Sequence, residues 1–325
     1  MSRYIVTGAA GFIAARVVEM LLEAGHTVVG VDNLNNAYDV RLKEWRLERL
    51  QKLPGFLFVR EDISDKKIIP MLKEHAGDCA AVINLAARAG VRSSVSDPWI
   101  YYQTNVDGAL NLLECCKQYS IPKFVQASSS SVYGDHNPMP YREDANTDLP
   151  LQPYAASKKA SEVLSYTYHY LHGLDVTIFR YFTVYGPAAR PDMAMFRFAQ
   201  WITEGKTVKI NGNGNQTRGF TYVDDIARGT IQGLKPVGYE IINLGGHEQI
   251  SMNDLVHLFE QKTGQKARLE YQPIHKADAR ANWADSSKAI DLLEWKPQVS
   301  LDEGVSRLVD WYRKERTWAS QVLTE

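Results

Sequence analysis

Several features that would define other classes of protein are missing from this chain of 325 residues. Its 37 basic and 38 acidic side chains nearly cancel, so no excess of charge favours nucleic acid or an anionic membrane as a partner. No apolar run reaches the roughly 18 residues that a membrane-spanning helix needs. Residues 3–12 predict a strand and a turn instead of a cleavable leader. We therefore expect a globular protein of the cytoplasm, with no nucleic acid or membrane partner.

Cysteine is also scarce. The three cysteines, Cys79, Cys115 and Cys116, have neither a metal-ligand spacing nor the pattern of a disulfide framework. They predict buried, reduced thiols, as is usual in the cytoplasm, and no metal site.

The first half of the chain alternates short apolar runs with longer amphipathic ones. Both faces of the short runs are apolar, which is typical of buried parallel strands. Strands are expected at residues 4–8, 27–32, 56–62, 80–87, 123–129 and 175–182. Helical spacing is found at residues 11–24, 40–53, 65–75, 98–119 and 154–172. This alternation predicts an α/β fold, a Rossmann-type doubly wound parallel sheet.

After residue 181 the sequence becomes rich in loops, with glycine, proline and asparagine at the turns. Short strands and helices follow, ending in an amphipathic helix near residues 302–316. We expect a smaller mixed α/β lobe that binds the substrate. The predicted nucleotide-binding domain takes residues 1–180 and roughly 221–245, and the lobe takes residues 181–220 and 246–325.

A glycine turn follows the first strand. Gly8 permits the tight turn, Gly11 lets backbone approach a pyrophosphate, and Ala14 allows close packing of helix on strand. The second strand ends at Asp32, about twenty residues further on, where an acid binds adenosine ribose hydroxyls. Because this carboxylate would repel a 2′-phosphate, the pattern favours NAD over NADP.

Other strand ends should complete the cofactor site. Asp62 and Ile63 are placed to meet the adenine, and the fourth strand brings Asn84 to the same edge of the sheet. Asn105 is either a buried structural amide or a site residue. The remaining residues expected to contact the cofactor are Phe12, Ile13, Asn33, Leu85, Ala86 and Ala87.

Tyr154 and Lys158 lie one helical turn apart. A tyrosine of ordinary pKa, near 10, is a poor base at neutral pH. A nearby ammonium and a positively charged nicotinamide ring would favour the phenolate and lower that pKa. The pair is therefore expected to act in catalysis and to contact the cofactor.

With these residues, the chain resembles the extended short-chain dehydrogenase/reductase superfamily, and within it the NAD-dependent nucleotide-sugar epimerases. The similarity runs from "TGAAGFIA" through "NLAARAGVR", "ASSSSVYG" and "YAASKKASE" to "NGNGNQTRGFTYVDDIARG" and "WADSSKA". The segments "AGVR", the serine run and "FTVYGPAARPDMA" are most similar to UDP-glucuronate 4-epimerases. The resemblance implies a UDP-sugar substrate, a homodimer and transient oxidation at carbon 4 of the sugar.

The resemblance also assigns roles. Ser129 corresponds to the family's catalytic Ser/Thr, which relays a proton to Tyr154, whereas Ser128 would satisfy a strand end. Relatives that dehydrate dTDP-glucose, or decarboxylate UDP-glucuronate, carry acids where this chain has serines only. The expected substrate-binding residues are Arg92, Ser130, Ser131, Thr183, Arg190, Arg218, Asp278 and Arg280. One departure is Gly219, since relatives read Arg-Asp-Phe where this chain has Arg-Gly-Phe.

Three other functions stay open at this stage. UDP-glucose/galactose 4-epimerase and UDP-glucuronate decarboxylase are the alternatives within the enzyme class. A non-catalytic NAD-binding scaffold is the alternative from another class, although it would need no Ser–Tyr–Lys set.

Overall fold

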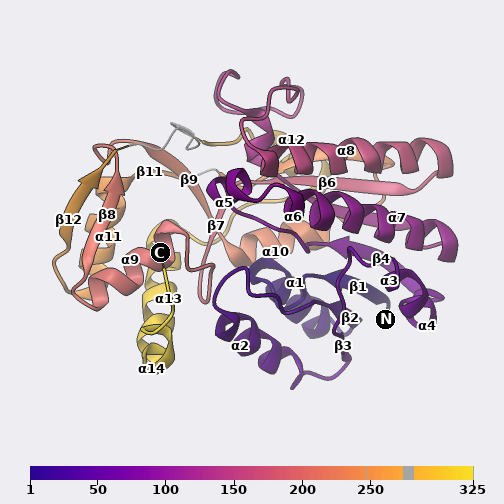
Figure 1. Ribbon diagram of the computed structural model, residues 1–325, viewed down its shortest axis with the longest axis horizontal. Helices are drawn as coiled ribbons and strands as arrows, with labels where there is room; N and C mark the ends of the chain where they lie inside the picture. Colours follow the sequence, from indigo (N-terminus) through magenta and orange to yellow (C-terminus); the bar gives the residue numbers. More distant parts are fainter. Residues whose placement is uncertain (247, 274–281, 325) are drawn as a thin grey trace.

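The computed structural model describes residues 1–246, 248–273 and 282–324. Figure 1 shows a large α/β domain with a smaller lobe beside it. The domain is built on a seven-stranded parallel sheet in the order β10-β6-β5-β4-β1-β2-β3. Its strands are β1 (Arg3–Thr7), β2 (Thr27–Val31), β3 (Phe56–Val59), β4 (Cys79–Asn84), β5 (Lys123–Ser129), β6 (Asp175–Tyr181) and β10 (Tyr239–Leu244). The expected doubly wound sheet is confirmed.

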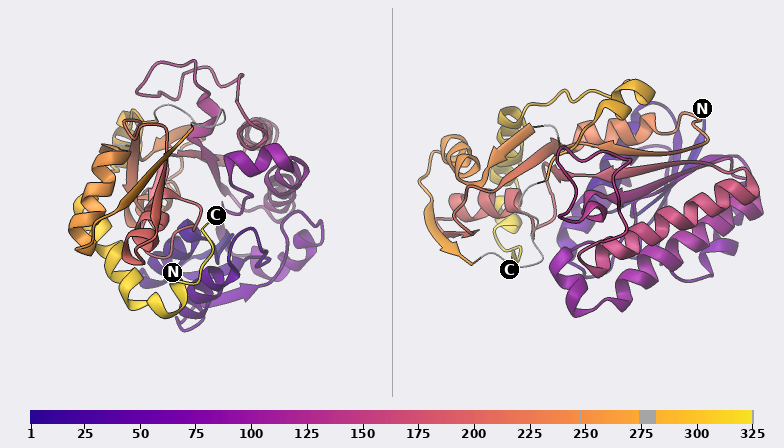
Figure 2. Two further views of the ribbon diagram at one scale, coloured as in Figure 1. Left: turned by 60° about the vertical axis from the view of Figure 1, so that its left-hand side comes forward. Right: turned by 90° about the horizontal axis from the view of Figure 1, so that it is seen from above.

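The strands are buried on both faces because their side chains alternate between two apolar cores. In β1, Tyr4 and Val6 enter one core and Ile5 enters the other. The first core is covered by α1 (Phe12–Glu23), α10 (Val223–Gln232) and α12 (Ser287–Leu293). The second is covered by α3 (Ile68–Met71), α7 (Gly108–Tyr119) and α8 (Pro153–His172). Figure 2 shows α7 and α8 running side by side on their face of the sheet.

Three expected elements differ from the sequence prediction. The strand expected at 56–62 is β3, an edge strand in which Leu57 is exposed, so it is not fully buried. The helix expected at 65–75 is two short helices, α3 and α4 (Lys73–Ala76). The helix expected at 98–119 is divided into α6 (Trp99–Tyr102), a π-helical turn over Gln103–Asp107 and α7. Periodicity alone does not reveal such breaks, because the apolar spacing continues across them.

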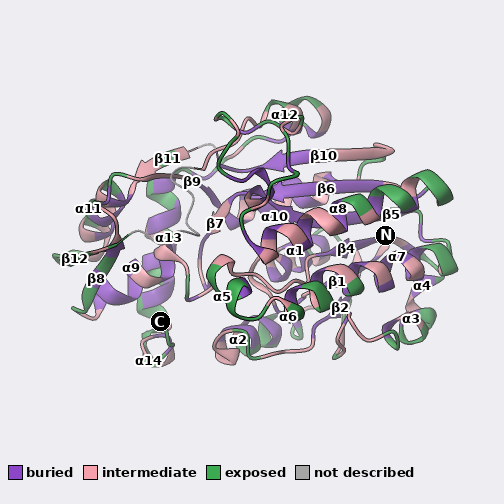
Figure 3. Cartoon of the chain, turned by 45° about the horizontal axis from the view of Figure 1, so that its top comes forward, coloured by how far each residue is buried: buried purple, intermediate pink, exposed green. Residues whose placement is uncertain are grey.

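The smaller lobe has its own apolar core. It contains a three-stranded sheet of β7 (Thr183–Tyr185), β9 (Thr217–Tyr222) and β11 (Glu248–Ser251), and a parallel pair of β8 (Thr207–Asn211) and β12 (Arg268–Gln272). Its helices are α9 (Ala194–Thr203), α11 (Met252–Thr263), α13 (Leu301–Lys314) and α14 (Arg316–Ala319). Figure 3 shows buried residues on the inner faces of α9 and α13 and exposed residues on the outer face of α8. The domain boundaries stay a proposal; α12 and Trp295, which we expected in the lobe, pack with the core of the sheet.

Candidate active site

The glycine turn lies where the order of the sheet reverses, between β1 and β4. Gly8 has a φ of +69°, and a Cβ on it would lie 2.8 Å from backbone atoms of Ala86, which follows β4. A Cβ on Gly11 would lie 2.7 Å from the carbonyl oxygen of Gly8. Both positions therefore exclude a side chain and leave a backbone cradle at the N-terminus of α1. Ligands of doubly wound sheets bind at such a switch point.

Asp32 follows β2 beside this cradle. Its Oδ2 accepts a hydrogen bond of 3.1 Å from the Ala10 amide, and its Oδ1 accepts one of 2.8 Å from the Leu34 amide. A carboxylate has about four acceptor positions, so two remain for the vicinal hydroxyls of a ribose. The free acceptor positions of Asp32 and the side-chain-free cradle fit a dinucleotide with an unmodified adenosine ribose.

A cavity of about 600 Å³ runs along these strand ends. Most of the predicted cofactor residues line it, namely Gly8, Gly11, Asp32, Asn33, Asp62, Ile63, Leu85, Ala86 and Ala87. Phe12 and Ile13 do not, because the Phe12 ring packs against the core of the lobe and Ile13 against the core of the sheet. Their side chains therefore serve packing, and only their backbone lies at the N-terminus of α1.

Hydrogen bonds hold the carboxylate of Asp62, which lies in the loop after β3, in place. Asp62 accepts bonds from the Asn33 amide (2.7 Å) and from the Ser64 hydroxyl (2.7 Å). Burial raises the pKa of Asp62, but these hydrogen bonds outweigh burial and hold the pKa below its usual value. The carboxylate is thus ionised and fixed at the cavity wall.

Two buried asparagines are structural. Asn84 accepts a bond from Thr7 (2.7 Å) and donates one to Gln126 (2.9 Å), which links β1, β4 and β5. Asn105, on the π-helical turn, exchanges hydrogen bonds with the backbone N–H and C=O of Arg88 and donates to Ser157. The turn directs this amide to the loop after β4, so the structural alternative for Asn105 is the correct one.

The four serines at the end of β5 differ in their surroundings. Ser128 donates a 2.6 Å bond to the buried carboxylate of Glu162 on α8, so it does not satisfy a strand end as we expected. Ser129 caps a 3₁₀ turn, accepting the Ser131 amide at 3.2 Å, and its oxygen lies 3.2 Å from the Ser131 hydroxyl. Ser130 is buried and accepts a bond of 2.9 Å from Asn282. The first and third serines of the run are therefore held by distant side chains, and Ser129 and Ser131 share one small polar cluster.

Tyr154 and Lys158 come from the first turns of α8, which packs on β5. The Ser129 hydroxyl acts on the Tyr154 phenol and favours a lower pKa for it, so these two side chains lie near each other. Lys158 donates a 2.9 Å bond to the carbonyl of Ala127, just before the serine run. Burial lowers the pKa of Lys158 to about 8, although the Glu162 carboxylate acts in the opposite direction.

The expected lowering of the Tyr154 pKa does not arise in the protein alone. Burial raises the pKa of Tyr154, while the Ser129 hydrogen bond and the positive charge of Arg190 act to lower it. Lys158 does not offset the burial, because its ammonium is directed to Ala127. The positive charge of a nicotinamide ring would act in the same direction as Arg190.

Arg190 forms the opposite wall of the cavity. Its guanidinium is paired with Asp192, with bonds of 3.1 and 2.6 Å, and reaches the carbonyl of Ala89 at 3.4 Å. Asp192 is thus the partner of Arg190 that the sequence did not reveal.

The ring of Tyr101 packs edge-on against Tyr154, with 6.1 Å between centroids.

The other predicted substrate residues are more dispersed. Thr183 begins β7, Arg218 lies on β9 and donates to the Thr217 carbonyl (2.8 Å), and Arg92 lies exposed on α5 (Val91–Ser96). Asp278 and Arg280 lie outside the described residues.

Sequence reasoning missed several residues at the site. Lys43 on α2 (Val40–Leu50) lines the cavity and donates to Asn35 at 3.1 Å. Tyr38 lies beneath Arg46, and the tail residues Leu323 and Thr324 also line the cavity. A lysine on the inner face of an amphipathic helix was a usable signal for Lys43, whereas nothing in the sequence places the tail.

Other parts of the described chain carry no comparable chemistry. The three cysteines are buried and free, as expected, and burial raises the pKa of Cys79 to about 11 and of Cys115 to about 12.

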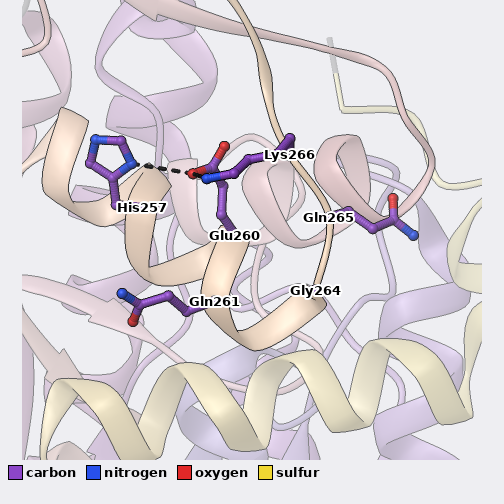
Figure 4. A pocket seen from close by; sticks show the side chains of 6 residues that line it. All are labelled: His257, Glu260, Gln261, Gly264, Gln265 and Lys266. Carbon is purple, nitrogen blue, oxygen red and sulfur yellow. Dashed lines mark hydrogen bonds and ion pairs between the residues drawn. The ribbon is translucent and has the colours of Figure 1, made fainter.

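No group of three or more His, Cys, Asp or Glu side chains among the described residues is placed to hold a metal ion. Within the same residues, no helix combines the length and apolar character needed to cross a bilayer. Figure 4 shows a hollow at the end of α11, where His257 and Lys266 already pair with Glu260.

Comparison with known proteins agrees with this geometry. The sequence pattern of the GDP-mannose 4,6-dehydratase family matches residues 5–308. A UDP-glucuronate 4-epimerase of Thermodesulfobacterium geofontis is 54% identical over 315 residues, 97% of each chain. The solved UDP-glucuronic acid 4-epimerase of Bacillus cereus, in complex with UDP-glucuronic acid and NAD, is 37% identical with a TM-score of 0.90, covering 96% of this chain and 99% of that one. The UDP-glucose 4-epimerase of Thermotoga maritima, solved with UDP-glucose, is 32% identical with a TM-score of 0.89, covering 97% and 99%.

Proposed function

The chain belongs to the GDP-mannose 4,6-dehydratase family, and from this premise we propose that it is an NAD-dependent UDP-glucuronate 4-epimerase. It interconverts UDP-glucuronate and UDP-galacturonate. The observation that carries the proposal is the serine run without any acid that ends β5, next to the turn of α8 that carries Tyr154 and Lys158, in a domain with a side-chain-free dinucleotide cradle.

The residues present fit NAD. Gly8 and Gly11 would admit the pyrophosphate, Asp32 would accept the adenosine ribose hydroxyls, and Lys158 would hold the nicotinamide ribose. Asn33, Asp62, Ile63, Leu85, Ala86 and Ala87 form the remaining wall. When bound, NAD accepts a hydride from carbon 4 of the sugar and returns it.

Ser129 and Tyr154 handle the proton that accompanies this exchange. The Ser129 hydroxyl bonds the 4-hydroxyl of the sugar and passes its proton to the Tyr154 phenolate, so that the C–O bond becomes a ketone as the C–H bond breaks. The 4-keto sugar then rotates within the site and presents its opposite face to the cofactor. Tyr154 returns the same proton to the oxygen as the C–H bond re-forms on the opposite face, so no atom is gained or lost.

A glucuronate adds one requirement. Its 4-keto form is a β-keto acid, which loses carbon dioxide when the carboxylate bond aligns with the ketone. Neutral donors that hold the carboxylate away from this alignment would prevent the loss. We assign this role to Ser130, Ser131 and Thr183, and the absence of an acid in residues 126–134 argues against the dehydratase and decarboxylase reactions.

The nucleotide end of the substrate would be held by positive charge. Arg218 would bind the diphosphate through a planar guanidinium, as would Arg280, and Asp278 would accept uridine ribose hydroxyls. Arg190, close to Tyr154, and Arg92 on α5 complete the proposed substrate residues.

We propose a homodimer in the cytoplasm. The outer face of α8 carries exposed apolar side chains, among them Val163, Tyr166, Tyr170 and Leu171. Pairing of α7 and α8 with the same helices of a second copy would bury them. Sedimentation should show a dimer, and Tyr170→Glu should shift it to a monomer; a monomeric wild-type protein would contradict the proposal.

Product analysis after incubation with UDP-glucuronate tests the function directly. UDP-galacturonate is expected, without added NAD. A UDP-pentose as the main product would instead identify a decarboxylase, turnover of UDP-glucose alone would identify a hexose epimerase, and bound NAD without turnover would identify a scaffold.

A further inference from the structure

The glycine that departs from the family pattern, Gly219, occupies a position on β9 where no side chain fits. A Cβ there would lie 2.4 Å from the carbonyl oxygen of Gly246 and 2.7 Å from its carbonyl carbon. Both are backbone atoms, so no change of rotamer relieves the contact. An aspartate at position 219 would therefore require a different backbone arrangement at this point.

The close approach of Gly219 to Gly246 brings the Gly219 backbone amide next to the segment that begins at Asn282. The amide donates a 2.9 Å bond to the carbonyl of Asn282. On the other side, the Tyr141 amide donates to the Trp283 carbonyl (3.0 Å), and the Asp285 amide donates to the Tyr141 carbonyl (2.9 Å). Backbone bonds thus hold the segment at Asn282 itself and at Trp283 and Asp285, which follow it.

From this position the Asn282 side chain reaches the serine run. Its Nδ2 donates a bond of 2.9 Å to the Ser130 oxygen, which is buried. Its Oδ1 is buried and has no hydrogen-bond partner among the described residues. Among the described residues, the Asn282 side-chain amide therefore makes a hydrogen bond only through its Nδ2, to Ser130.

We propose that Asn282 is a positioning residue that makes Ser130 a hydrogen-bond donor toward the substrate and so favours a sugar carboxylate over a hydroxymethyl group. The inference rests on the proposed function, because it assigns Ser130 to the carboxylate. A serine hydroxyl has one proton, and an oxygen that accepts from Asn282 leaves that proton free to be donated to another acceptor. A carboxylate only accepts hydrogen bonds, so a fixed donor suits it.

This arrangement also explains Gly219. Because Gly219 has no side chain, its backbone lies close to Gly246 and its amide donates to the Asn282 carbonyl, while the Asn282 side chain donates to Ser130. The departure from the family pattern is thus connected to the serine run through two hydrogen bonds.

A double-mutant cycle tests the proposal. Asn282→Ala, Ser130→Ala and the double variant are compared for affinity toward UDP-glucuronate and toward UDP, which has no carboxylate. A hydrogen bond to a charged group corresponds to about a tenfold change in affinity or more. We expect each single variant to bind UDP-glucuronate about tenfold more weakly, to bind UDP as the wild type does, and to release more pentose product.

The double variant should bind UDP-glucuronate no more weakly than Ser130→Ala does, because Asn282 acts through Ser130. Asn213→Ala, an exposed asparagine of the same lobe, is the matched control and should change neither affinity. NAD content and melting temperature, measured for every variant, register any loss of folding.

Asn282→Asp tests the direction of the hydrogen bond. Its oxygens only accept, so they should draw the Ser130 proton away from the substrate and weaken UDP-glucuronate binding more than Asn282→Ala does. Wild-type affinity in this variant, additive losses in the cycle, or equal loss of UDP and UDP-glucuronate would each overturn the inference. A wild-type protein that does not epimerise UDP-glucuronate would instead contradict the proposed function itself.

Discussion

At the scale of single residues, the chemistry depends on the oxygen of Tyr154. Because burial raises the pKa of Tyr154, the phenol needs nearby positive charge to act as a base. Tyr154→Phe keeps the ring and removes only the proton acceptor. We expect turnover to fall by about 10²- to 10⁴-fold with NAD still bound. The initial rate with UDP-glucuronate and the NAD released on denaturation are the measurements.

Tyr101→Phe is the control for that change. It removes a hydroxyl that bonds Ser93 at 2.6 Å and keeps the ring that packs on Tyr154. It should retain most of the activity. A Tyr154→Phe variant with more than half of the wild-type rate would exclude Tyr154 as the base.

Lys158 makes stability depend on pH. Its pKa is lowered to about 8 by burial, whereas in the unfolded chain it is about 10.4. Between these values the unfolded state binds more protons, so the free energy of unfolding rises with pH. Below pH 8 both states are protonated and the full cost of burying the ammonium is present.

Lys158→Met removes this titration. Relative to the variant, the wild type should therefore gain stability between pH 7 and pH 9.5. Urea unfolding at both pH values, with NAD saturating, measures the difference, and exposed Lys66→Met should show no such trend. A gap that is constant with pH would show that Lys158 does not titrate in this range.

At the scale of elements, a buried ion pair fastens the catalytic helix to the sheet. Glu162 of α8 accepts bonds of 2.9 and 2.8 Å from Arg180 of β6, and one of 2.6 Å from Ser128 of β5. Both charged side chains are almost fully buried, and the guanidinium also stacks on the ring of Tyr133 at 4.8 Å. The network fixes the position of the helix that carries Tyr154 and Lys158.

Glu162→Gln should destabilise the protein by about 3–5 kcal/mol, because it leaves the Arg180 charge buried without a counterion. The double variant Glu162→Met with Arg180→Met should recover much of this loss, since both charges are then absent. Urea unfolding measures both changes. A cost below about 1 kcal/mol for Glu162→Gln would show that water reaches the guanidinium.

At the scale of the whole molecule, the C-terminal segment joins the lobe to the cofactor domain. The amide of buried Gln200 on α9 donates to the carbonyls of Ala319 and Val322, and its oxygen accepts from Thr324. Arg41 on α2 bonds the side chain and the carbonyl of Gln321 from the other side. The segment thus spans the two parts beside the cavity wall.

Ending the chain after Ser320 should lower the melting temperature by several degrees, because each buried polar group left unpaired costs about 1–3 kcal/mol. It should also speed the loss of NAD, since Leu323 and Thr324 line the cavity. Thermal unfolding and the NAD content after gel filtration are the measurements, with exposed Gln321→Ala as the mild control. An unchanged melting temperature together with full NAD retention would contradict the bridging role.

The sequence alone determined the sheet, the glycine turn, Asp32 and the Tyr154–Lys158 pair. These features depend on local spacing, which translates directly into strand ends and helix faces. The same reasoning predicted the helical run over residues 99–119 but not the π-helical turn within it that carries Asn105.

Only the tertiary structure decided which partners the polar side chains find. Ser128 bonds Glu162, Arg190 pairs with Asp192, and Asn282 reaches Ser130. In the first and last of these, segments distant in the sequence meet because the strands and loops converge at one edge of the sheet, and no local pattern records that meeting. The raised pKa of Tyr154 has the same origin, since burial is a property of the folded molecule and not of the residue.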